Sequence, residues 1–314
     1  MDRHGGETES TVEMSVLVTT DDGYHIFTSS GKHLTSLEGH RVASFTPGPD
    51  GTFLAIVDGH ELWSHGADGE WTPLTKTDPE LTAAVAVGDT AFVGTADAHV
   101  MRRGPSGSLE PVVAFDAVAG RDTWHEVGVP LQVRSMTATA DGRALLVNVH
   151  VGGIPRSVDG GMTWQPTIDV DADVHQVVAH PTRPEIVVAA ASVGLCRSRD
   201  GGATWDATTD GMELSYARAV AIIGDEVVVS GSEGPRSRRA AIYRAPVDGG
   251  AIDSVVGGLP EYLAGNVDTR CLASDGTRVA LVDGDGDLWQ STEALGGFTR
   301  VASRLRGVTG VAIA

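Results

Sequence analysis

The sequence contains few lysines, cysteines and aromatic residues and no long apolar run. Lys32 and Lys76 are the only lysines among 23 basic residues, and 42 acidic residues give the 314-residue chain a net charge of −19. A surface this acidic cannot neutralise many phosphates, which excludes broad nucleic-acid binding. No segment reaches the ~18 apolar residues that a membrane-spanning helix needs, so we expect no membrane association.

The two cysteines and the polar N-terminus bear on the cellular compartment. Cys196 and Cys271 are too few for a disulfide framework, and we expect both to be buried thiols. Residues 1–13 are polar and acidic with no apolar stretch after them, unlike a secretory signal, and predict a disordered tail before a single domain at 14–314. We therefore expect a cytoplasmic protein. An acidic, lysine-poor chain rich in alanine and valine resembles halophilic archaeal proteins, whose carboxylates keep the chain hydrated at high salt.

Glycine is abundant, and the chain contains an internal repeat. Forty glycines and 14 prolines favour many short strands joined by tight turns. Two segments, 157–164 and 198–205, share the pattern S-x-D-G-G-x-T-W at an offset of 41 residues. The pattern predicts a hairpin whose glycines take positive φ, whose Ser and Asp accept turn amides, and whose Trp packs against the hairpin base. The predicted structural residues are Ser157, Asp159, Gly161 and Trp164, and Ser198, Asp200, Gly202 and Trp205.

Weaker copies of this box and regularly spaced apolar runs extend the repeat along the chain. Each unit of ~40–45 residues predicts four strands, the size of one propeller blade. Insertions are expected near residues 104–121 and 234–239. The weaker copies lie at 64–71, 122–124, 248–250 and 291–298, and the innermost strands are predicted to begin near Arg41, Leu81, Arg134, His175, Arg218 and Val267.

The two ends of the chain complete one further blade. Residues 308–314 predict a lone innermost strand, while residues 14–37 predict three strands without one. A blade shared by both termini closes the ring and removes an exposed sheet edge. The sequence therefore predicts an all-β fold, a seven-bladed β-propeller of four-stranded antiparallel blades, and we expect a monomer.

The two complete boxes resemble the Asp boxes of BNR and sortilin-type propellers and of the photosystem II assembly and stability factor family. In such proteins the box lies at the blade periphery, away from the ligand site, so the resemblance implies a fold and not an activity. No phosphate loop, nucleophile elbow or zinc-ligand spacing is present, and no cofactor is predicted.

Arginines recur where the predicted innermost strands begin. Loops that lead into these strands share one rim with the loops between second and third strands, and guanidinium groups bind carboxylates with paired donors. We expect a non-enzymatic scaffold that binds a protein, a peptide or another anionic ligand at this rim. The alternative is that the arginines pair with rim acids such as Asp171, Asp173, Asp268 and Asp283. The candidate ligand-binding residues are Arg41, Arg134, His175, Arg218, Arg270, Arg236, Arg238 and Arg239.

A sialidase-like glycoside hydrolase acting on an anionic sugar is the alternative function. Sialidases resemble this arrangement in using arginines on a substrate carboxylate beside a Tyr–Glu pair, and Glu213, Tyr216 and Tyr262 lie in loops on the same predicted face. The Phe/Tyr-Arg-Ile-Pro motif typical of that family is absent. The absence favours the scaffold over the enzyme.

Two acidic clusters were considered as metal sites. Asp283, Asp285 and Asp287 alternate as in calcium loops, but the later glycine and acid of such a loop are missing. Asp169, Asp171 and Asp173 precede His175, with His150 as a further candidate. In so acidic a chain these carboxylates are better explained as solvated turn residues, and no metal is predicted.

Overall fold

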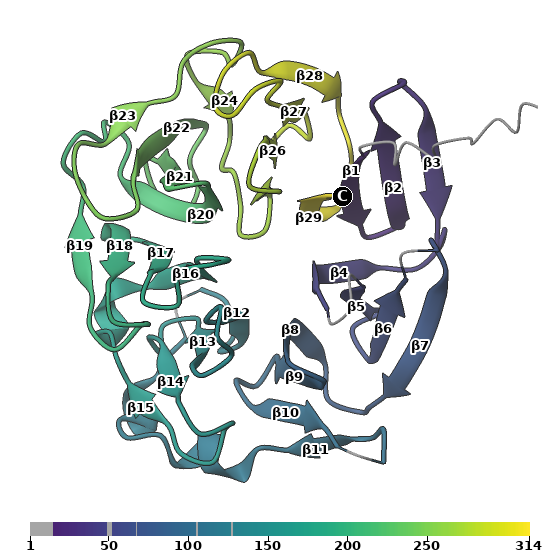
Figure 1. Cartoon of the computed structure of the whole chain (residues 1–314), viewed down its shortest axis with the longest axis vertical. Coiled ribbons are helices and arrows are strands. Elements are labelled where there is room, and N and C mark those ends of the chain that lie inside the picture. The colour runs from purple at the N-terminus through teal and green to yellow at the C-terminus, as the bar shows by residue number, and fades with distance from the viewer. Residues whose placement is uncertain (1–14, 49–51, 67, 105, 127) are drawn as a thin grey trace, which may run out of the picture.

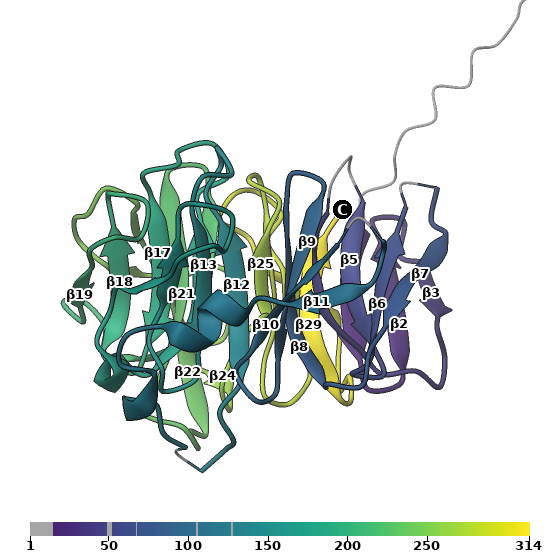
Figure 2. The same ribbon diagram turned by 90° about the horizontal axis from the view of Figure 1, so that it is seen from below.

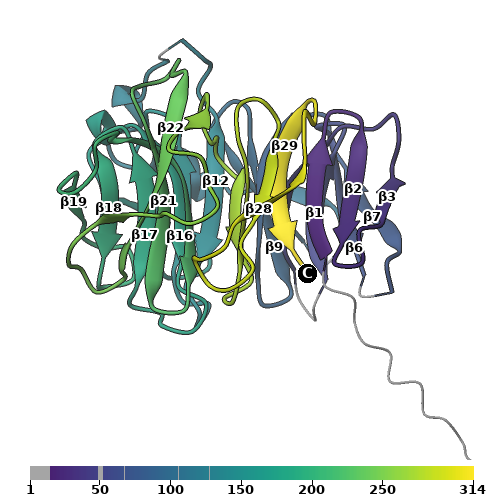
Figure 3. The ribbon, with the colours of Figure 1, turned by 90° about the horizontal axis from the view of Figure 1, so that it is seen from above.

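The computed structural model describes residues 15–48, 52–66, 68–104, 106–126 and 128–314. Its strands form seven antiparallel sheets arranged as blades around a central channel (Figure 1). Edge-on views show a flat disc (Figures 2 and 3). The predicted all-β, seven-bladed propeller is confirmed. The predicted tail, residues 1–13, lies outside the described residues.

The first blade is built from strands of both ends of the described chain, and the next two blades follow it in chain order. Strand β29 pairs with β1 on one side of the ring, so the C-terminal strand is the innermost strand of the N-terminal blade, as predicted. Blade A is β29 (Val308–Ile313), β1 (Ser15–Thr20), β2 (Gly23–Thr28) and β3 (His33–Ser36); blade B is β4 (Val42–Pro47), β5 (Phe53–Val57), β6 (Glu61–His65) and β7 (Trp71–Lys76); blade C is β8 (Leu81–Val87), β9 (Thr90–Thr95), β10 (Val100–Arg103) and β11 (Leu109–Pro111).

The other four blades follow in chain order. Blade D is β12 (Val133–Ala138), β13 (Leu145–Val149), β14 (Pro155–Ser157) and β15 (Gln165–Pro166); blade E is β16 (Val174–Ala179), β17 (Val187–Ala191), β18 (Gly194–Ser198) and β19 (Asp206–Thr208); blade F is β20 (Tyr216–Ile223), β21 (Glu226–Ser232), β22 (Arg239–Pro246) and β23 (Asp253–Ser254), with β24 (Leu263–Ala264) beside β22; blade G is β25 (Leu272–Ser274), β26 (Val279–Val282), β27 (Leu288–Gln290) and β28 (Thr299–Ala302).

Burial decreases from the second strand of each blade toward the rim. Every residue of β13 and β17 is buried, because blades pack against both faces of these strands. Such strands consist of continuous apolar runs, since neither face meets water. The outermost strands β3 and β28 are largely exposed. The core therefore consists of the interfaces between neighbouring blades.

Hydrogen bonds between innermost strands hold neighbouring blades together around the channel. The Ala84 amide donates to Ser44 Oγ at 2.9 Å, and Thr82 Oγ1 donates to the Val133 carbonyl at 2.6 Å. The Val177 amide donates to Ser135 Oγ at 3.0 Å. These short polar side chains on the channel wall thus form hydrogen bonds that join neighbouring blades of the ring. Equivalent bonds join Gln176 to the Val220 amide and Thr309 to the Val42 carbonyl.

The predicted strand starts agree with the structure except in the last unit. Strands β4, β8, β12, β16 and β20 begin within two residues of the predicted positions. Strand β25 begins at Leu272 rather than near Val267, because the Cys271 amide closes a turn on the Asp268 carbonyl and Arg270 within that turn has a positive φ of 67°. The weak box at 122–124 is also wrong: it lies in and beside the 3₁₀ helix η3 (Arg121–Thr123), which follows η2 (Val113–Ala117) on the outside of the disc (Figure 2).

The two complete boxes form the expected hairpins. Their paired glycines have φ between 68° and 88°, which is the left-handed region predicted for them. The Gly161 amide donates to Ser157 Oγ at 2.9 Å, and the Thr163 amide donates to Asp159 Oδ1 at 2.9 Å. The second box repeats these bonds with Ser198 and Asp200. Trp164 is buried against Phe115, with ring centroids 5.0 Å apart.

Cys196 and Cys271 are both buried free thiols, as predicted. A further 3₁₀ helix, η4 (Val170–Ala172), precedes β16. Among the described residues, no helix is long and apolar enough to cross a membrane.

Candidate functional site

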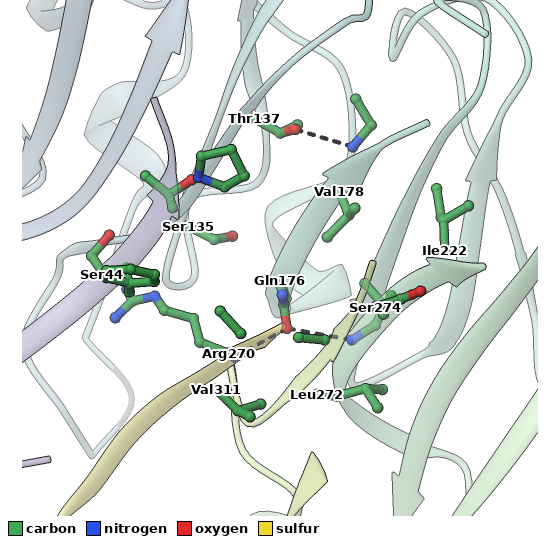
Figure 4. A pocket seen from close by; sticks show the side chains of 18 of the residues that line it. Ser44, Ser135, Thr137, Gln176, Val178, Ile222, Arg270, Leu272, Ser274 and Val311 are labelled. Atoms are coloured by element: carbon green, nitrogen blue, oxygen red, sulfur yellow. Dashed lines mark hydrogen bonds between the residues drawn. The ribbon is translucent and has the colours of Figure 1, made fainter. Parts of the chain in front are cut away.

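Two cavities lie along the channel axis. One, of about 930 Å³, opens at the end where the innermost strands of blades D, E and F begin; we call it the Arg134 mouth. The other, of about 600 Å³, is lined by all seven innermost strands; we call it the lower channel cavity (Figure 4). Residues of the Arg134 mouth include Arg134, His150, Asp173, Tyr216, Arg218 and residues 233–237.

β-Bulges aim the side chains of the Arg134 mouth. In β12 the register shifts between Val133 and Ser135, which leaves Arg134 as the extra residue. In β16 the same shift isolates His175, and β20 is irregular between Ala217 and Val220, around Arg218. A bulge turns a side chain out of the regular alternation of a strand, and bulges are frequent beside functional sites. Three consecutive blades therefore carry a basic side chain at equivalent positions: Arg134, His175 and Arg218.

Arg134 lies in the mouth without a directly paired acid among the described residues, although the charges of Asp268 and Asp173 act on it from further away. Its side chain is largely buried, yet within the described residues its guanidinium forms neither a hydrogen bond nor an ion pair. Burial first, and then the nearby charge of Arg218, lower the pKa of Arg134. A guanidinium has five donors, and unpaired buried donors are unfavourable. The geometry thus leaves a cation at the base of the mouth with its hydrogen-bonding capacity unused.

Beside Arg134 lies a polar cluster of two histidines, an aspartate and a tyrosine. His175 Nδ1 lies 2.6 Å from the Ala217 carbonyl, and its Nε2 lies 3.0 Å from the Tyr216 hydroxyl. Asp173 Oδ2 lies 3.4 Å from both Tyr216 Oη and His175 Nε2. His150 Nε2 lies 3.7 Å from Asp173 Oδ1, which is buried without a hydrogen bond. His175 is buried behind Tyr216, so it supports the wall of the mouth rather than lining it.

The pKa values in this cluster follow from burial and from the arginines. Burial, followed by the charge of Arg134, lowers the pKa of His150 to about 4. The same two causes act in that order on His175 and lower its pKa, although Asp173 opposes them. Burial would raise the pKa of Asp173, but His175, His150 and Arg134 outweigh it, so the pKa is lowered. At neutral pH the cluster therefore contains neutral imidazoles and one carboxylate.

The predicted arginines divide into paired and unpaired groups. Arg41 pairs with Asp21 at 3.0 Å in the neighbouring blade and does not line the mouth. Arg218 pairs with Asp268, the only one of the four predicted rim acids that pairs with an arginine in the described residues. Arg239 pairs with Glu233 at 2.8 Å and stacks on Tyr262. Arg236 and Arg238 are exposed and, within the described residues, their guanidinium groups form no hydrogen bond.

Arg270 lies inside the channel rather than on the rim where it was predicted. Its Nη2 donates to the Thr82 carbonyl at 2.7 Å and to the Arg134 carbonyl at 2.5 Å. Thr82 and Arg134 belong to blades C and D, across the ring from blade G. The side chain therefore crosses the channel and lies between the Arg134 mouth and the lower channel cavity, which it lines.

The candidate hydrolase residues do not converge. Tyr262 Oη donates to Glu213 at 3.0 Å, as a Tyr–Glu pair would require. Neither residue lines the Arg134 mouth, however, and Glu213 is exposed to solvent. Tyr216 does line it but contacts His175 and Asp173 instead of a glutamate.

The acidic clusters considered as metal sites are occupied by other bonds. Asp283 Oδ1 accepts the amides of Asp285 and Asp287 at 3.1 and 3.0 Å. Asp169 accepts the Asp171 amide at 2.9 Å in the turn before β16. Within the described ranges, no group of three or more His, Cys, Asp or Glu residues is arranged to hold a metal ion.

Sequence reasoning missed two features of the channel. It treated His150 only as a metal ligand and Asp173 only as a metal ligand or a rim acid, and it did not identify Gln176, whose Oε1 accepts the amides of Val220 and Arg270. One signal was present: the triplets Val-Arg-Ser at 133–135 and Val-His-Gln at 174–176 recur at the blade interval. They mark the bulge and the ring-closing residue that follows it.

Comparison with known proteins shows the fold alone. No protein-family model and no curated protein sequence matches the chain. An ancestral GH74 enzyme is similar in structure over 95% of this chain, with a TM-score of 0.61 and 14% identity. The computationally designed Ika8 protein is similar over 92% of the chain and 83% of its own, with a TM-score of 0.57 and 13% identity.

A TolB-like protein from Agrobacterium tumefaciens is a further structural neighbour. It is similar over 81% of this chain and 90% of its own, with a TM-score of 0.51 and 12% identity. The chain spans only 40% of the length of the GH74 enzyme. Because one fold hosts many activities, function has to be argued from the channel itself.

Proposed function

We propose that this propeller is a non-enzymatic binding scaffold whose Arg134 mouth takes a carboxylate of a protein or peptide partner. One observation carries the proposal: a largely buried guanidinium faces a pocket of about 930 Å³ and has no partner within the described residues. A bound carboxylate would supply the missing acceptors, and a bidentate pair with arginine is among the stronger hydrogen-bonded contacts.

The loop at residues 233–239 makes the mouth suitable for a polymer chain rather than for a small ion. Arg236 and Arg238 extend from it into solvent, while the charge of Glu233 is already neutralised by Arg239. A partner that lies across this loop would meet two further free guanidinium groups after its first carboxylate reaches Arg134. An acidic segment of a protein or peptide fits this spacing of donors.

The experiment measures binding to an array of acidic peptides and of matched peptides with Asn and Gln in place of Asp and Glu. It is performed in molar KCl, where a Debye length of ~3 Å leaves only close contacts. The wild-type protein should prefer the acidic peptides, and Arg134→Met should weaken their binding at least ~10-fold, because one charge-assisted contact is lost.

Arg41→Met is the matched control, since Arg41 is paired with Asp21 and lies outside the mouth. This variant should bind as the wild type does. Equal binding of the acidic and amide peptides would contradict the proposal, as would an Arg134→Met variant that folds and keeps the preference.

The sialidase-like hydrolase is the second candidate, and the Tyr262–Glu213 hydrogen bond is what favours it. It is weaker because the pair is solvent-exposed and separate from the unpaired Arg134. Release of a fluorescent aglycone from a sialic-acid glycoside by the purified protein, lost in Tyr262→Phe, would replace the scaffold with this function.

We also propose that the chain is of the Asp-box type and is a halophilic, cytoplasmic monomer. The matching hydrogen bonds of the two hairpins support the first point. The excess of 42 acidic over 23 basic residues supports adaptation to high salt.

A further inference from the structure

The lower channel cavity differs from the Arg134 mouth in its lining. Apolar side chains contribute most of the wall, including Phe45, Met136, Ile222, Leu272 and Val311 (Figure 4). Its volume of about 600 Å³ falls within the ~300–1,000 Å³ typical of small-molecule sites. A cavity of this kind suits a molecule with an apolar body.

Several polar groups of the wall are already used by the fold. Ser44, Ser135 and Thr137 each accept an amide of the next blade. The carboxylate of Asp275, at the edge of the cavity, is bound by Arg278 at 2.7 Å. These groups therefore offer little to a ligand, and the strongest donor left in the wall is a charged side chain.

That side chain is Arg270, which enters the cavity from blade G (Figure 4). Only its Nη2 is engaged, by two backbone carbonyls. Its Nε and Nη1 form no hydrogen bond within the described residues, and no carboxylate there lies within 4.0 Å of its guanidinium. Burial, then the charge of Arg134, lower the pKa of Arg270 to about 10, so the group remains a cation at neutral pH.

We propose that the lower channel cavity binds a small monocarboxylate with an apolar body, with the carboxylate on Nε and Nη1 of Arg270. An anion neutralises a charge that the protein leaves unpaired, and its hydrocarbon part replaces water along the apolar wall. A single cation in a largely apolar wall favours a ligand with one anionic end and an apolar body. This site is separate from the Arg134 mouth and does not depend on the function proposed for it.

The test titrates the full-length protein with sodium octanoate and with octanamide, its uncharged counterpart of equal length, by isothermal calorimetry at pH 7. Octanoate should bind at least ~10-fold more tightly than octanamide, since a charge-assisted pair forms only with the acid. Arg270→Met, which keeps an unbranched apolar stem and removes the charged guanidinium, should abolish this preference. Arg300→Met is the matched control, because Arg300 lies on the outermost strand of blade G and pairs with Asp287.

A second measurement does not depend on the folding of the variant. In wild-type protein labelled at methionine methyl groups, the signal of Met136, which lines the cavity, should shift with octanoate. The signal of Met162, which is 73% exposed on an Asp-box hairpin, should not shift. A Met136 signal that stays still at saturating octanoate, or equal affinity for acid and amide, would overturn the proposal. Loss of acidic-peptide binding in Arg134→Met would leave it untouched.

Discussion

The Asp-box hairpins and the channel use their charged side chains in opposite ways. In the hairpin at 157–164, Asp159 accepts hydrogen bonds from the Ser157 and Thr163 hydroxyls and from the Thr163 amide, and each donor lies at most four residues from Asp159. In the channel, Arg134 and Arg270 belong to different blades, and both keep unused donors. The hairpin charges are satisfied by their own segment, whereas the channel charges have capacity left for something outside the chain.

Charged side chains of the hairpins therefore stabilise the fold, whereas those of the channel keep donors that a ligand can use. A satisfied carboxylate on the blade edge stabilises a turn and offers nothing to a ligand. A buried guanidinium without a partner lowers the stability of the folded chain, since its desolvation is not offset. Substitutions in the hairpins should therefore change the stability of the fold, and substitutions of the channel arginines should change ligand binding.

The largest loss of stability is expected for a substitution on the hydrophobic side of the first hairpin. Trp164→Ala removes an indole that is 5% exposed and packs on Phe115, and it should reduce the free energy of unfolding by about 3–5 kcal/mol. Chemical denaturation in high salt measures it. Acidic-peptide binding should persist at temperatures where the variant is folded.

Trp205→Ala is the matched control for that prediction. Trp205 holds the equivalent place in the second box but is less buried, and its indole donates to Thr167 Oγ1 at 3.0 Å. It should lose clearly less stability than Trp164→Ala. Equal losses would show that burial of the indole is not what the hairpin contributes.

A smaller effect is expected for the carboxylate of the second hairpin. Asp200→Ala removes bonds from Ser198, Ala203 and Thr204, and for an exposed turn we expect a loss of about 1 kcal/mol. Burial would raise the pKa of the Asp200 carboxyl, but the hydrogen bonds that it accepts outweigh burial and lower the pKa. This stabilisation is present at neutral pH and is lost as the pH falls below about 4, through the lowered pKa.

Thermal unfolding at pH 7 and pH 3 checks the Asp200 prediction, with Asp210→Ala as the control. The Asp210 carboxylate is exposed and accepts no hydrogen bond within the described residues. The gap in stability between Asp200→Ala and the wild type should narrow at pH 3. A gap that stays constant with pH would mean that the carboxylate charge is not involved.

The smallest effect on stability is expected in the channel, where the effect on binding should be large. Arg134→Met should leave the free energy of unfolding unchanged or raise it by up to about 1 kcal/mol, because an unpaired buried charge is replaced by an apolar side chain. Arg278→Met is the contrasting variant. Because Arg278 is paired with Asp275, this substitution should lower the free energy of unfolding. A clear loss of stability in Arg134→Met would indicate a partner within the fold.

The sequence predicted the fold well because the repeat is local. The glycines of each box, the apolar run of each second strand and the interval between units are all visible within one unit. The prediction was wrong where the chain departs from the repeat: Asp122 to Trp124 retains letters of the box but lies in a 3₁₀ segment, and Arg270 interrupts the strand expected near Val267. Neither departure changes the local composition enough to be recognised.

By itself, then, the sequence determined the number of blades, the blade shared by both termini and the internal bonding of the two hairpins. The number of blades and the hairpin bonds follow from contacts within about forty residues or from turn chemistry that needs no partner. The shared blade follows because the first unit lacks an innermost strand and the last segment of the chain supplies one. Only the tertiary structure decided which of the predicted arginines are free, because two of their pairings join different blades: Arg218 reaches Asp268, and Arg41 reaches Asp21. Within the described residues, a charge becomes available to a ligand when ring closure leaves it without an ion pair to an acid of its own chain, and no single unit of the repeat contains that information.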